Sequence, residues 1–344
     1  MPDEKPEHVT GTIEAKDCRR AAERIGPWVR RTPLVESPFL SRQNGARVLL
    51  KLENHQITGS FKARGAVSKI LSLSAEERAR GVVAASSGNH GLGVAYGAGR
   101  LGIDGEVFLP EGTSAMTRDA IRDHGARISI HGDDCLETEN AARSAAEGSG
   151  RAYVSPYNDP DVVAGQGSIG VELAEDLDSL AAVYVAVGGG GLISGVGVAV
   201  KDAFPGARVI GCSPERSCVL HESVAAGRIL DIESSPTLSH STAGGVEDGA
   251  ITFDMCREIV DDWRLVSEVE IAAAMRIFID REHMLIEGAA GVAVAGCLRE
   301  QQRFAGGVVV VVICGANVGS EDLREVLTTG RSADASSGNC GEEC

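Results

Sequence analysis

Short apolar runs alternate with amphipathic stretches along most of the chain. Apolar residues that run together over about four to eight positions predict strands, whereas apolar residues at helical spacing predict helices. The predicted strands are 46–52, 81–85, 105–110, 127–131, 152–155, 182–187, 207–212 and 307–314. The predicted helices are 15–29, 91–101, 114–124, 135–148, 165–177 and 192–203, with another after Lys62. Because parallel strands need helical crossovers, this alternation predicts an α/β protein with mostly parallel sheets flanked by helices.

The two ends of the chain depart from this pattern. Residues 1–14 are polar and acidic, and we expect them to form a mobile arm without a signal peptide. The last stretch, 331–344, is poor in apolar residues and is predicted to be a disordered tail. The length of 344 residues suggests two domains, at roughly 150 residues for each.

The composition excludes several classes of partner. A net charge of −16 argues against nucleic acid and against anionic membranes. The most apolar run, 308–313, is too short to cross a bilayer. The nine cysteines are scattered and form no CxxC pair, so neither a zinc ribbon nor a disulfide framework is indicated. We therefore predict a cytoplasmic protein with no nucleic-acid or membrane partner.

Lys62 occupies an unusual position for a lysine. It follows the strand 46–52 and stands at the start of a predicted helix, behind Thr58 and Ser60 as candidate caps. The helix dipole disfavours positive charge at that end, so this placement would lower the pKa of the amine. A neutral amine is what covalent bonding to a carbonyl group needs. An ordinary solvated lysine remains the alternative on this stretch alone.

Two later turns are candidate anion-binding sites. Ser86-Ser87-Gly88-Asn89-His90-Gly91 follows the strand 81–85 and opens a helix, which places backbone N–H groups where they can meet an anion. Gly188-Gly189-Gly190-Gly191-Leu192 follows the strand 182–187, and its glycines would let the backbone wrap a phosphate closely. A plain strand-to-helix turn is the alternative for the first motif, and a flexible loop is the alternative for the second.

Other motifs are absent or incomplete. The glycine run does not match the dinucleotide fingerprint GxGxxG, because its third glycine falls on Ser194, and the chain has no GxxxxGK[ST] or GxSxG motif. His221-Glu222 begins like HExxH, but position 225 is alanine and the other histidines show no ligand spacing. A third turn, Cys314-Gly315-Ala316-Asn317, follows the last strand, where ligands bind in open α/β sheets. A buried structural cysteine is the alternative there.

These turns together resemble the fold-type II pyridoxal-phosphate enzymes, and within them the threonine/serine dehydratases and serine racemase. The resemblance covers roughly residues 15 to 328. It rests on motifs that occur in the family's order: 59–65 (GSFKARG), 86–91 (SSGNHG), 164–168 (AGQGS), 188–192 (GGGGL), 287–291 (EGAAG) and 314–317 (CGAN). It implies a two-domain fold like the tryptophan synthase β chain, with a large cofactor-binding domain from 15–66 and 158–330 and a small domain from 67–157.

The resemblance also implies roles for individual residues. Lys62 would hold pyridoxal 5'-phosphate covalently and later move the Cα proton, and Ser87 would be the second catalytic residue. The cofactor's other contacts would be Phe61, Asn89, Gly188, Gly189, Gly190, Gly191, Leu192, Glu287 and Cys314. The substrate's carboxylate would meet Ser86, Ser87, Gly88, Asn89 and His90. Cys314 would face the ring nitrogen in place of the usual serine, and either residue is neutral.

Two departures from the family pattern concern metal and substrate. Metal-dependent relatives carry acidic ligands where this chain has Ser213 and Val219, so no metal is expected at the usual site. Many relatives read Ala-Asp-Gly where this chain has Ala243-Gly244-Gly245, in a loop that shapes the mouth of the site. The identity of the substrate therefore stays open.

The function expected from this resemblance is that of a pyridoxal-phosphate lyase. It would convert a β-hydroxy-α-amino acid, such as threonine or serine, to a 2-oxo acid and ammonia. The alternatives are an amino-acid racemase or a bifunctional racemase and dehydratase, and, in another class, a non-catalytic α/β module that binds a phosphorylated metabolite. The expected partner is a small-molecule amino acid, and the expected assembly is a homodimer.

Overall fold

The structure, a computed structural model, describes residues 13–328 and contains two parallel sheets side by side. The larger sheet has the strand order β1-β2-β10-β7-β8-β9, and only β1 runs antiparallel to its neighbour. The smaller sheet has the order β5-β4-β3-β6 and is parallel throughout. This confirms the α/β prediction. The tail predicted for 331–344 and nearly all of the predicted arm lie outside the described residues.

The bounds of the elements follow in chain order. The strands are β1 (Leu34–Glu36), β2 (Arg47–Lys51), β3 (Val82–Ala85), β4 (Gly105–Leu109), β5 (Arg127–Ile130), β6 (Ala152–Tyr153), β7 (Ala182–Ala186), β8 (Arg208–Pro214), β9 (Asp262–Val266) and β10 (Val308–Val312). The first helices are α1 (Ala15–Ile25), α2 (Pro38–Asn44), α3 (Lys62–Ser72), α4 (Ala75–Arg80), α5 (Asn89–Leu101), α6 (Ala115–Asp123) and α7 (Cys135–Ser149). The later helices are α8 (Pro160–Asp176), α9 (Gly191–Ala203), α10 (Val219–Ala226), α11 (Ile251–Ile259), α12 (Glu268–Ile277), α13 (Gly288–Leu298) and α14 (Ser320–Thr328).

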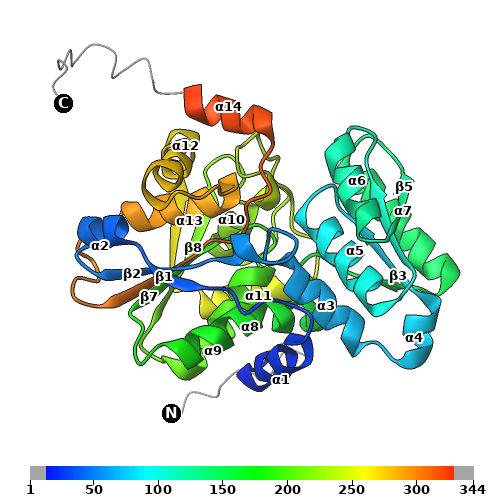
Figure 1. Cartoon of the computed structure of the whole chain (residues 1–344), viewed down its shortest axis with the longest axis horizontal. Coiled ribbons are helices and arrows are strands. Elements are labelled where there is room, and N and C mark those ends of the chain that lie inside the picture. The colour runs from blue at the N-terminus through cyan, green and yellow to red at the C-terminus, as the bar shows by residue number, and fades with distance from the viewer. Residues whose placement is uncertain (1–12, 329–344) are drawn as a thin grey trace, which may run out of the picture.

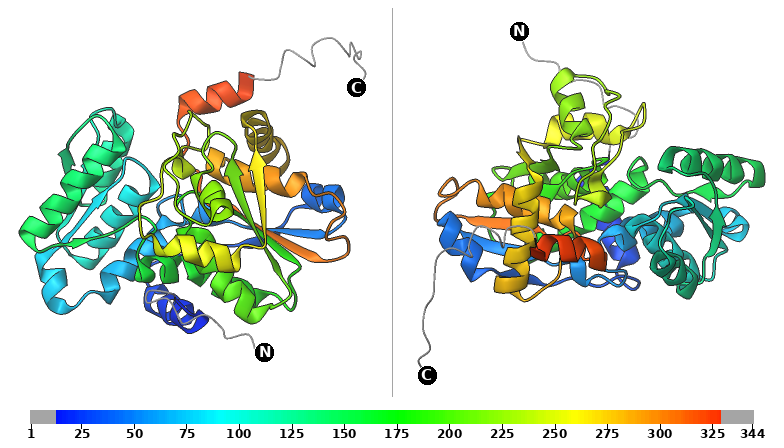
Figure 2. Two further views of the ribbon diagram at one scale, coloured as in Figure 1. Left: turned by 180° about the vertical axis from the view of Figure 1, so that it is seen from behind. Right: turned by 90° about the horizontal axis from the view of Figure 1, so that it is seen from above.

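Helices cover both faces of each sheet. Helices α8, α9 and α11 lie against one face of the larger sheet, with α1 packed on α8, and α13 with α12 covers the other face (Figure 1). In the smaller lobe, α5 and α7 pack against β3 and β4 (Figure 1). The two further views in Figure 2 show the lobes as neighbours joined through α3, which packs on α5 on one side and on α8 on the other.

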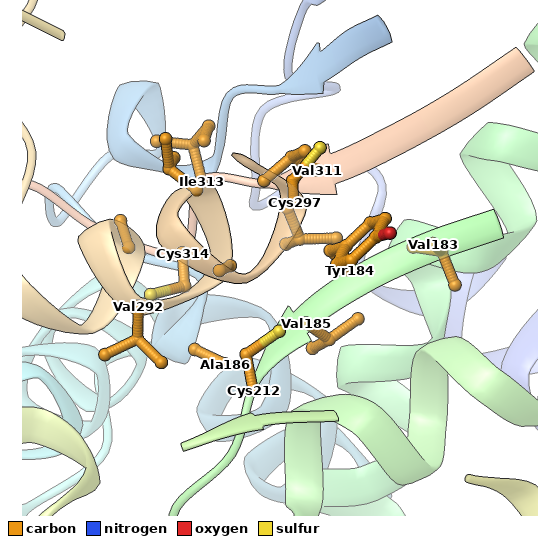
Figure 3. Packing of buried hydrophobic residues seen from close by; sticks show 14 of the residues in the cluster. Val183, Tyr184, Val185, Ala186, Cys212, Val292, Cys297, Val311, Ile313 and Cys314 are labelled. Atoms are coloured by element: carbon orange, nitrogen blue, oxygen red, sulfur yellow. The ribbon is translucent and has the colours of Figure 1, made fainter. Parts of the chain in front are cut away.

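The main core fills the larger lobe. Its centre is formed by the apolar strands β7 and β10 and by α13, a helix that is apolar on all sides and almost fully buried. Figure 3 shows Cys314 and Cys212 within this packing, beside residues such as Val185 and Val292. Cys314 is 2% exposed, so the turn after β10 leaves the core with a thiol still inside it.

Three helix boundaries differ from the sequence prediction. Helix α1 ends at Ile25 rather than at residue 29, because Gly26 and then a proline follow it. Helix α8 begins at Pro160 rather than 165, where the Asp159 side chain accepts the N–H groups of two following residues. Helix α5 begins at Asn89 rather than 91, which places Asn89 and His90 in its first turn.

Candidate active site

The candidate site is built by two turns that hydrogen-bond to each other. Ser60 and Gly315 form an antiparallel bridge, and the Phe61 N–H donates to the Cys314 carbonyl at 3.0 Å. The Asn317 amide donates to the Thr58 carbonyl at 2.9 Å. These bonds fix the start of α3 against the end of β10, although the two segments lie far apart in the sequence.

Lys62 is the first residue of α3 and its amine points to the lobe boundary. Its Nζ donates to the Pro156 carbonyl at 2.8 Å and lies 5.3 Å from the centre of the Phe61 ring. Burial lowers the pKa of the amine to about 8, against the opposing influence of Cys314 and Glu287. The sequence analysis expected a lowered pKa from the helix dipole, whereas the structure points to lost hydration as the main cause.

The caps predicted for this helix are wrong. Phe61 is the residue that precedes α3, and no side chain caps the helix. The hydroxyl groups of Thr58 and Ser60 are buried and make no hydrogen bond within the described part of the chain. The backbone pairing with residues 314–317 therefore sets the start of the helix in place of a side-chain cap.

Glu287 lies at the centre of a polar cluster that joins the two lobes. The Asn89 amide donates to both carboxylate oxygens at 2.9 Å, and the Asn317 N–H donates to one of them at 3.2 Å. Asn317 also donates its amide to Asn89 at 2.6 Å, and Asn89 reaches the Ser241 hydroxyl at 3.2 Å. Burial raises the pKa of Glu287, while the hydrogen bonds from Asn89, Ser241 and Asn317 act against that rise.

Cys314 and His90 are buried neutral groups beside these residues. Burial and the nearby Glu287 raise the pKa of the Cys314 thiol well above its ordinary value, so the thiol stays protonated. Burial, together with the Lys62 charge, lowers the pKa of His90 to about 3. The His90 Nε2 lies 2.8 Å from the Val154 carbonyl, which makes Nε2 the protonated nitrogen. The His90 ring is therefore turned toward β6, and its backbone N–H is what it can offer to a ligand.

The segment 86–90 reaches the boundary from the smaller lobe. The Gly88 N–H donates to the Ser86 hydroxyl at 3.2 Å, which closes the turn before α5. The Ser87 hydroxyl and the backbone N–H groups of Ser87 and His90 make no hydrogen bond with any described residue. Helix N-termini with open N–H groups favour anions.

The four glycines after β7 form a close-packed loop. Gly190 has a φ of 86°, and a Cβ at Gly189 would lie 2.4 Å from the Tyr157 ring. Within the described chain, no acceptor meets the N–H groups of residues 189–192. The Thr252 hydroxyl holds the Gly189 carbonyl at 2.7 Å. The loop thus presents donors and no side chain, which is the chemistry of an anion cradle.

Leu192 and several partners of the site were placed differently by the sequence. Leu192 is buried in the main core, so its side chain packs there and only its backbone can face a ligand. The sequence analysis quoted Asn317 without a role and missed Tyr157, Ser241 and Thr252. No local motif marks these three residues, because each reaches the site through a fold contact.

Comparisons with known proteins agree with this geometry. Residues 25–315 match a family described as pyridoxal-phosphate dependent enzyme. The chain is 40% identical over 318 residues to an L-threonine ammonia-lyase of Thermotoga maritima, covering 92% of this chain and 79% of that protein. Among solved structures, a threonine deaminase of T.th. gives a TM-score of 0.82 at 36% identity and covers 89% of this chain and 99% of its own. Maize serine racemase gives a TM-score of 0.86 at 28% identity, with 92% and 97% covered.

Proposed function

The chain belongs to the pyridoxal-phosphate dependent enzymes, and we propose that it is a lyase that converts a β-hydroxy-α-amino acid to a 2-oxo acid and ammonia. Threonine and serine are the proposed substrates, because the relatives above are named for threonine and serine. The observation that carries the proposal is a lysine amine with a pKa of about 8 between two turns that present open backbone donors.

The residues present fit the cofactor. A glycine loop with open N–H groups suits its phosphate, and we assign that role to Gly188–Leu192. Lys62 has the lowered pKa that a covalent attachment needs. When bound, the cofactor supplies an electron sink for the bond that breaks at the substrate's Cα. Phe61 would lie against it, and Asn89 and Glu287 would contact its ring substituents.

The neutral thiol of Cys314 favours elimination. A protonated thiol carries no negative charge with which to hold a proton on a ring nitrogen, so the electron sink stays weak. A weak sink suits loss of a β-hydroxyl more than a long-lived carbanion. Lys62 moves the proton at Cα, and the N-terminus of α5, with Ser86–His90, holds the carboxylate.

Racemisation is the second candidate activity, favoured by one observation. The Ser87 hydroxyl lies at the lobe boundary and is half-buried without a hydrogen bond to any described residue, so it is free to move a proton on the face opposite Lys62. No basic side chain among the described residues contacts it to restore that proton. We therefore propose that elimination outpaces inversion. The non-catalytic binding module is set aside because the chain belongs to an enzyme family.

The test is product analysis with the cofactor-loaded enzyme. Threonine, serine and other β-hydroxy amino acids are supplied in turn, and 2-oxo acid and ammonia are measured beside chiral chromatography of the remaining amino acid. We expect keto acid to exceed inverted amino acid for the best substrate. Inversion that outpaces ammonia release would make this enzyme a racemase.

We also propose a cytoplasmic homodimer. The seven cysteines in the described residues are all free, which suits a reducing compartment. None of the described helices is long and apolar enough to cross a membrane. Light scattering after size exclusion measures the assembly, and a monomeric mass for the active enzyme would contradict the dimer.

A further inference from the structure

A cluster of metal-ligating side chains lies outside the active site, at the start of α10. Cys218 precedes the helix, and His221 and Glu222 follow three and four residues later on the same face. One ligand atom from each of the three residues lies within 4.8 Å of the other two. The Glu222 carboxylate is 3.1 Å from the His221 Nδ1 and 4.0 Å from the Cys218 sulfur.

The three groups are free to turn toward an ion. Apart from Glu222, the Cys218 thiol contacts only the Glu215 carbonyl at 3.7 Å among the described atoms, which is a weak sulfur contact. The His221 ring packs edge-on against Trp263 with centroids 5.4 Å apart. This packing orients the ring, so that Nδ1 faces the carboxylate before any ion arrives.

The donor set selects the kind of metal. Thiolate, imidazole and carboxylate together are typical ligands of Zn²⁺, whereas Mg²⁺ and Ca²⁺ require oxygen ligands. The thiolate and the carboxylate would carry two negative charges and balance a divalent ion. Three protein ligands leave a fourth tetrahedral position open to water. The helix dipole favours the anionic ligands at this end but opposes the cation, so we expect micromolar affinity.

This cluster is separate from the positions at which metal-dependent relatives bind their ion. Ser213 is buried and donates its hydroxyl to the Val187 carbonyl at 3.1 Å, and Val219 is an apolar residue of the helix interior. Neither can ligate a metal. The sequence analysis found no ligand spacing around His221 because it sought HExxH and did not pair this histidine with Cys218.

We propose that Cys218, His221 and Glu222 form a binding site for zinc or a similar borderline-soft divalent cation. Leu220 stands between the ligands on the same helix. A Cβ at Gly190 would lie 2.7 Å from its side chain, so α10 packs directly on the glycine loop. An ion on α10 therefore sits close behind the cradle proposed for the cofactor, and its own ligands belong to no part of that cradle.

The test measures Zn²⁺ binding to the cofactor-loaded full chain by calorimetry, after removal of metal with EDTA and under a non-thiol reductant. Cys340 and Cys344 are replaced by serine in every sample, because their thiols would compete for zinc. We expect one Zn²⁺ per chain, and at least about tenfold weaker binding in Cys218→Ser and in His221→Ala. Cys135→Ser, which removes a thiol of α7, is the matched control and should leave binding unchanged.

A second readout separates ligation from loss of fold. Co²⁺ in place of Zn²⁺ should give a thiolate-to-metal charge-transfer band that Cys218→Ser abolishes and Cys135→Ser retains. Equal zinc affinity in the parent and in both ligand variants would overturn the proposal and leave an ordinary His221–Glu222 hydrogen bond. Mg²⁺ that competes equally with zinc would overturn the choice of metal.

Discussion

The two lobes are held together in different ways. The larger lobe has one continuous apolar core that runs through β7, β10 and α13. The smaller lobe has separate, alanine-rich clusters on either side of its sheet. The larger lobe also contains a fully buried network of charges, whereas the ion pairs of the smaller lobe lie mostly at its surface.

This difference matches the division of labour in the proposed site. The glycine loop, Glu287 and Cys314 all come from the heavily packed lobe, and catalytic groups need rigid support. The substrate-facing segment Ser86–His90 comes from the lobe with the smaller core. Weakly packed regions open at lower free-energy cost, so we expect the substrate side to be the more adaptable one.

The largest expected effect comes from Lys62→Ala. Loss of this amine removes both the covalent attachment and the proton transfer at Cα, so we expect at least about a thousandfold loss in turnover. Borohydride should then fail to fix the cofactor to the chain, as mass spectrometry would show. Lys16→Ala, at an exposed position of α1, should keep full activity. Wild-type turnover in Lys62→Ala would refute the assignment.

The next effect is on stability and concerns the buried network of the larger lobe. The Arg64 guanidinium donates to Glu53 at 2.8 Å and to Glu172 at 2.6 Å, and Lys51 also pairs with Glu172. Burial opposes the charge on Arg64, but Glu53 and Glu172 outweigh burial and raise its pKa. Arg64→Met leaves buried carboxylates unpaired, so we expect a loss of about 3–5 kcal/mol in the free energy of unfolding.

The matched control for that variant is Arg19→Met. Arg19 pairs with Asp202 at 2.7 Å, and both side chains are about half exposed, at 54% and 50%. Such a pair contributes about 0–1 kcal/mol. Urea denaturation measures both variants, and equal losses would mean that the buried network does not set the rigidity of the larger lobe.

Gly189→Ala tests whether the glycine loop holds the cofactor. A Cβ there would lie 2.4 Å from the Tyr157 ring, so the loop must shift, at a cost of about 1–3 kcal/mol. We expect cofactor affinity to fall by about tenfold or more, measured by fluorescence titration of the cofactor-free protein. Gly206→Ala is the control, since a Cβ at Gly206 meets nothing within 4 Å. Unchanged affinity in Gly189→Ala would place the phosphate elsewhere.

The pH dependence of cofactor attachment tests the burial of Lys62. The neutral amine is the reactive form, and burial lowers its pKa from 10.5 to about 8. The attachment rate of the cofactor-free protein should therefore rise about tenfold per pH unit below pH 8 and level off above it. An absorbance assay follows the rate. A rate that still climbs steeply above about pH 9.5 would show a solvated lysine.

The sequence predicted elements whose determinants are local. Strand β10 is a run of valines, and the glycine loop after β7 is unmistakable, so both were found. The partners of the site were not, because contacts such as Lys62 with Pro156 join segments that only the fold brings together. Likewise, the start of α3 depends on pairing with residues 314–317, and no local cap could reveal that.

The smallest expected effect tests the joint between the lobes. Arg143 on α7 contacts Glu247 of the larger lobe at 2.7 Å, and the two side chains are 37% and 30% exposed. Its guanidinium also lies 4.4 Å from the centre of the Tyr153 ring and bonds Glu139 at 2.6 Å, so Arg143 is held in place when it meets Glu247. A pair this exposed is screened by salt and contributes about 0.2–1 kcal/mol.

A double-mutant cycle with Arg143→Ala and Glu247→Ala isolates that contribution, since each single variant also loses other contacts. We expect a coupling of about 0.5 kcal/mol in urea denaturation at low salt, which disappears at high salt. The same cycle on Arg122 and Asp119, a pair within the smaller lobe at 3.1 Å, controls for surface pairing in general. If only the Arg143–Glu247 cycle also changes KM for the amino acid, the closing of the smaller lobe on its substrate depends on this contact. If neither cycle does, the Asn89–Glu287 cluster is sufficient to hold the two sides of the site together.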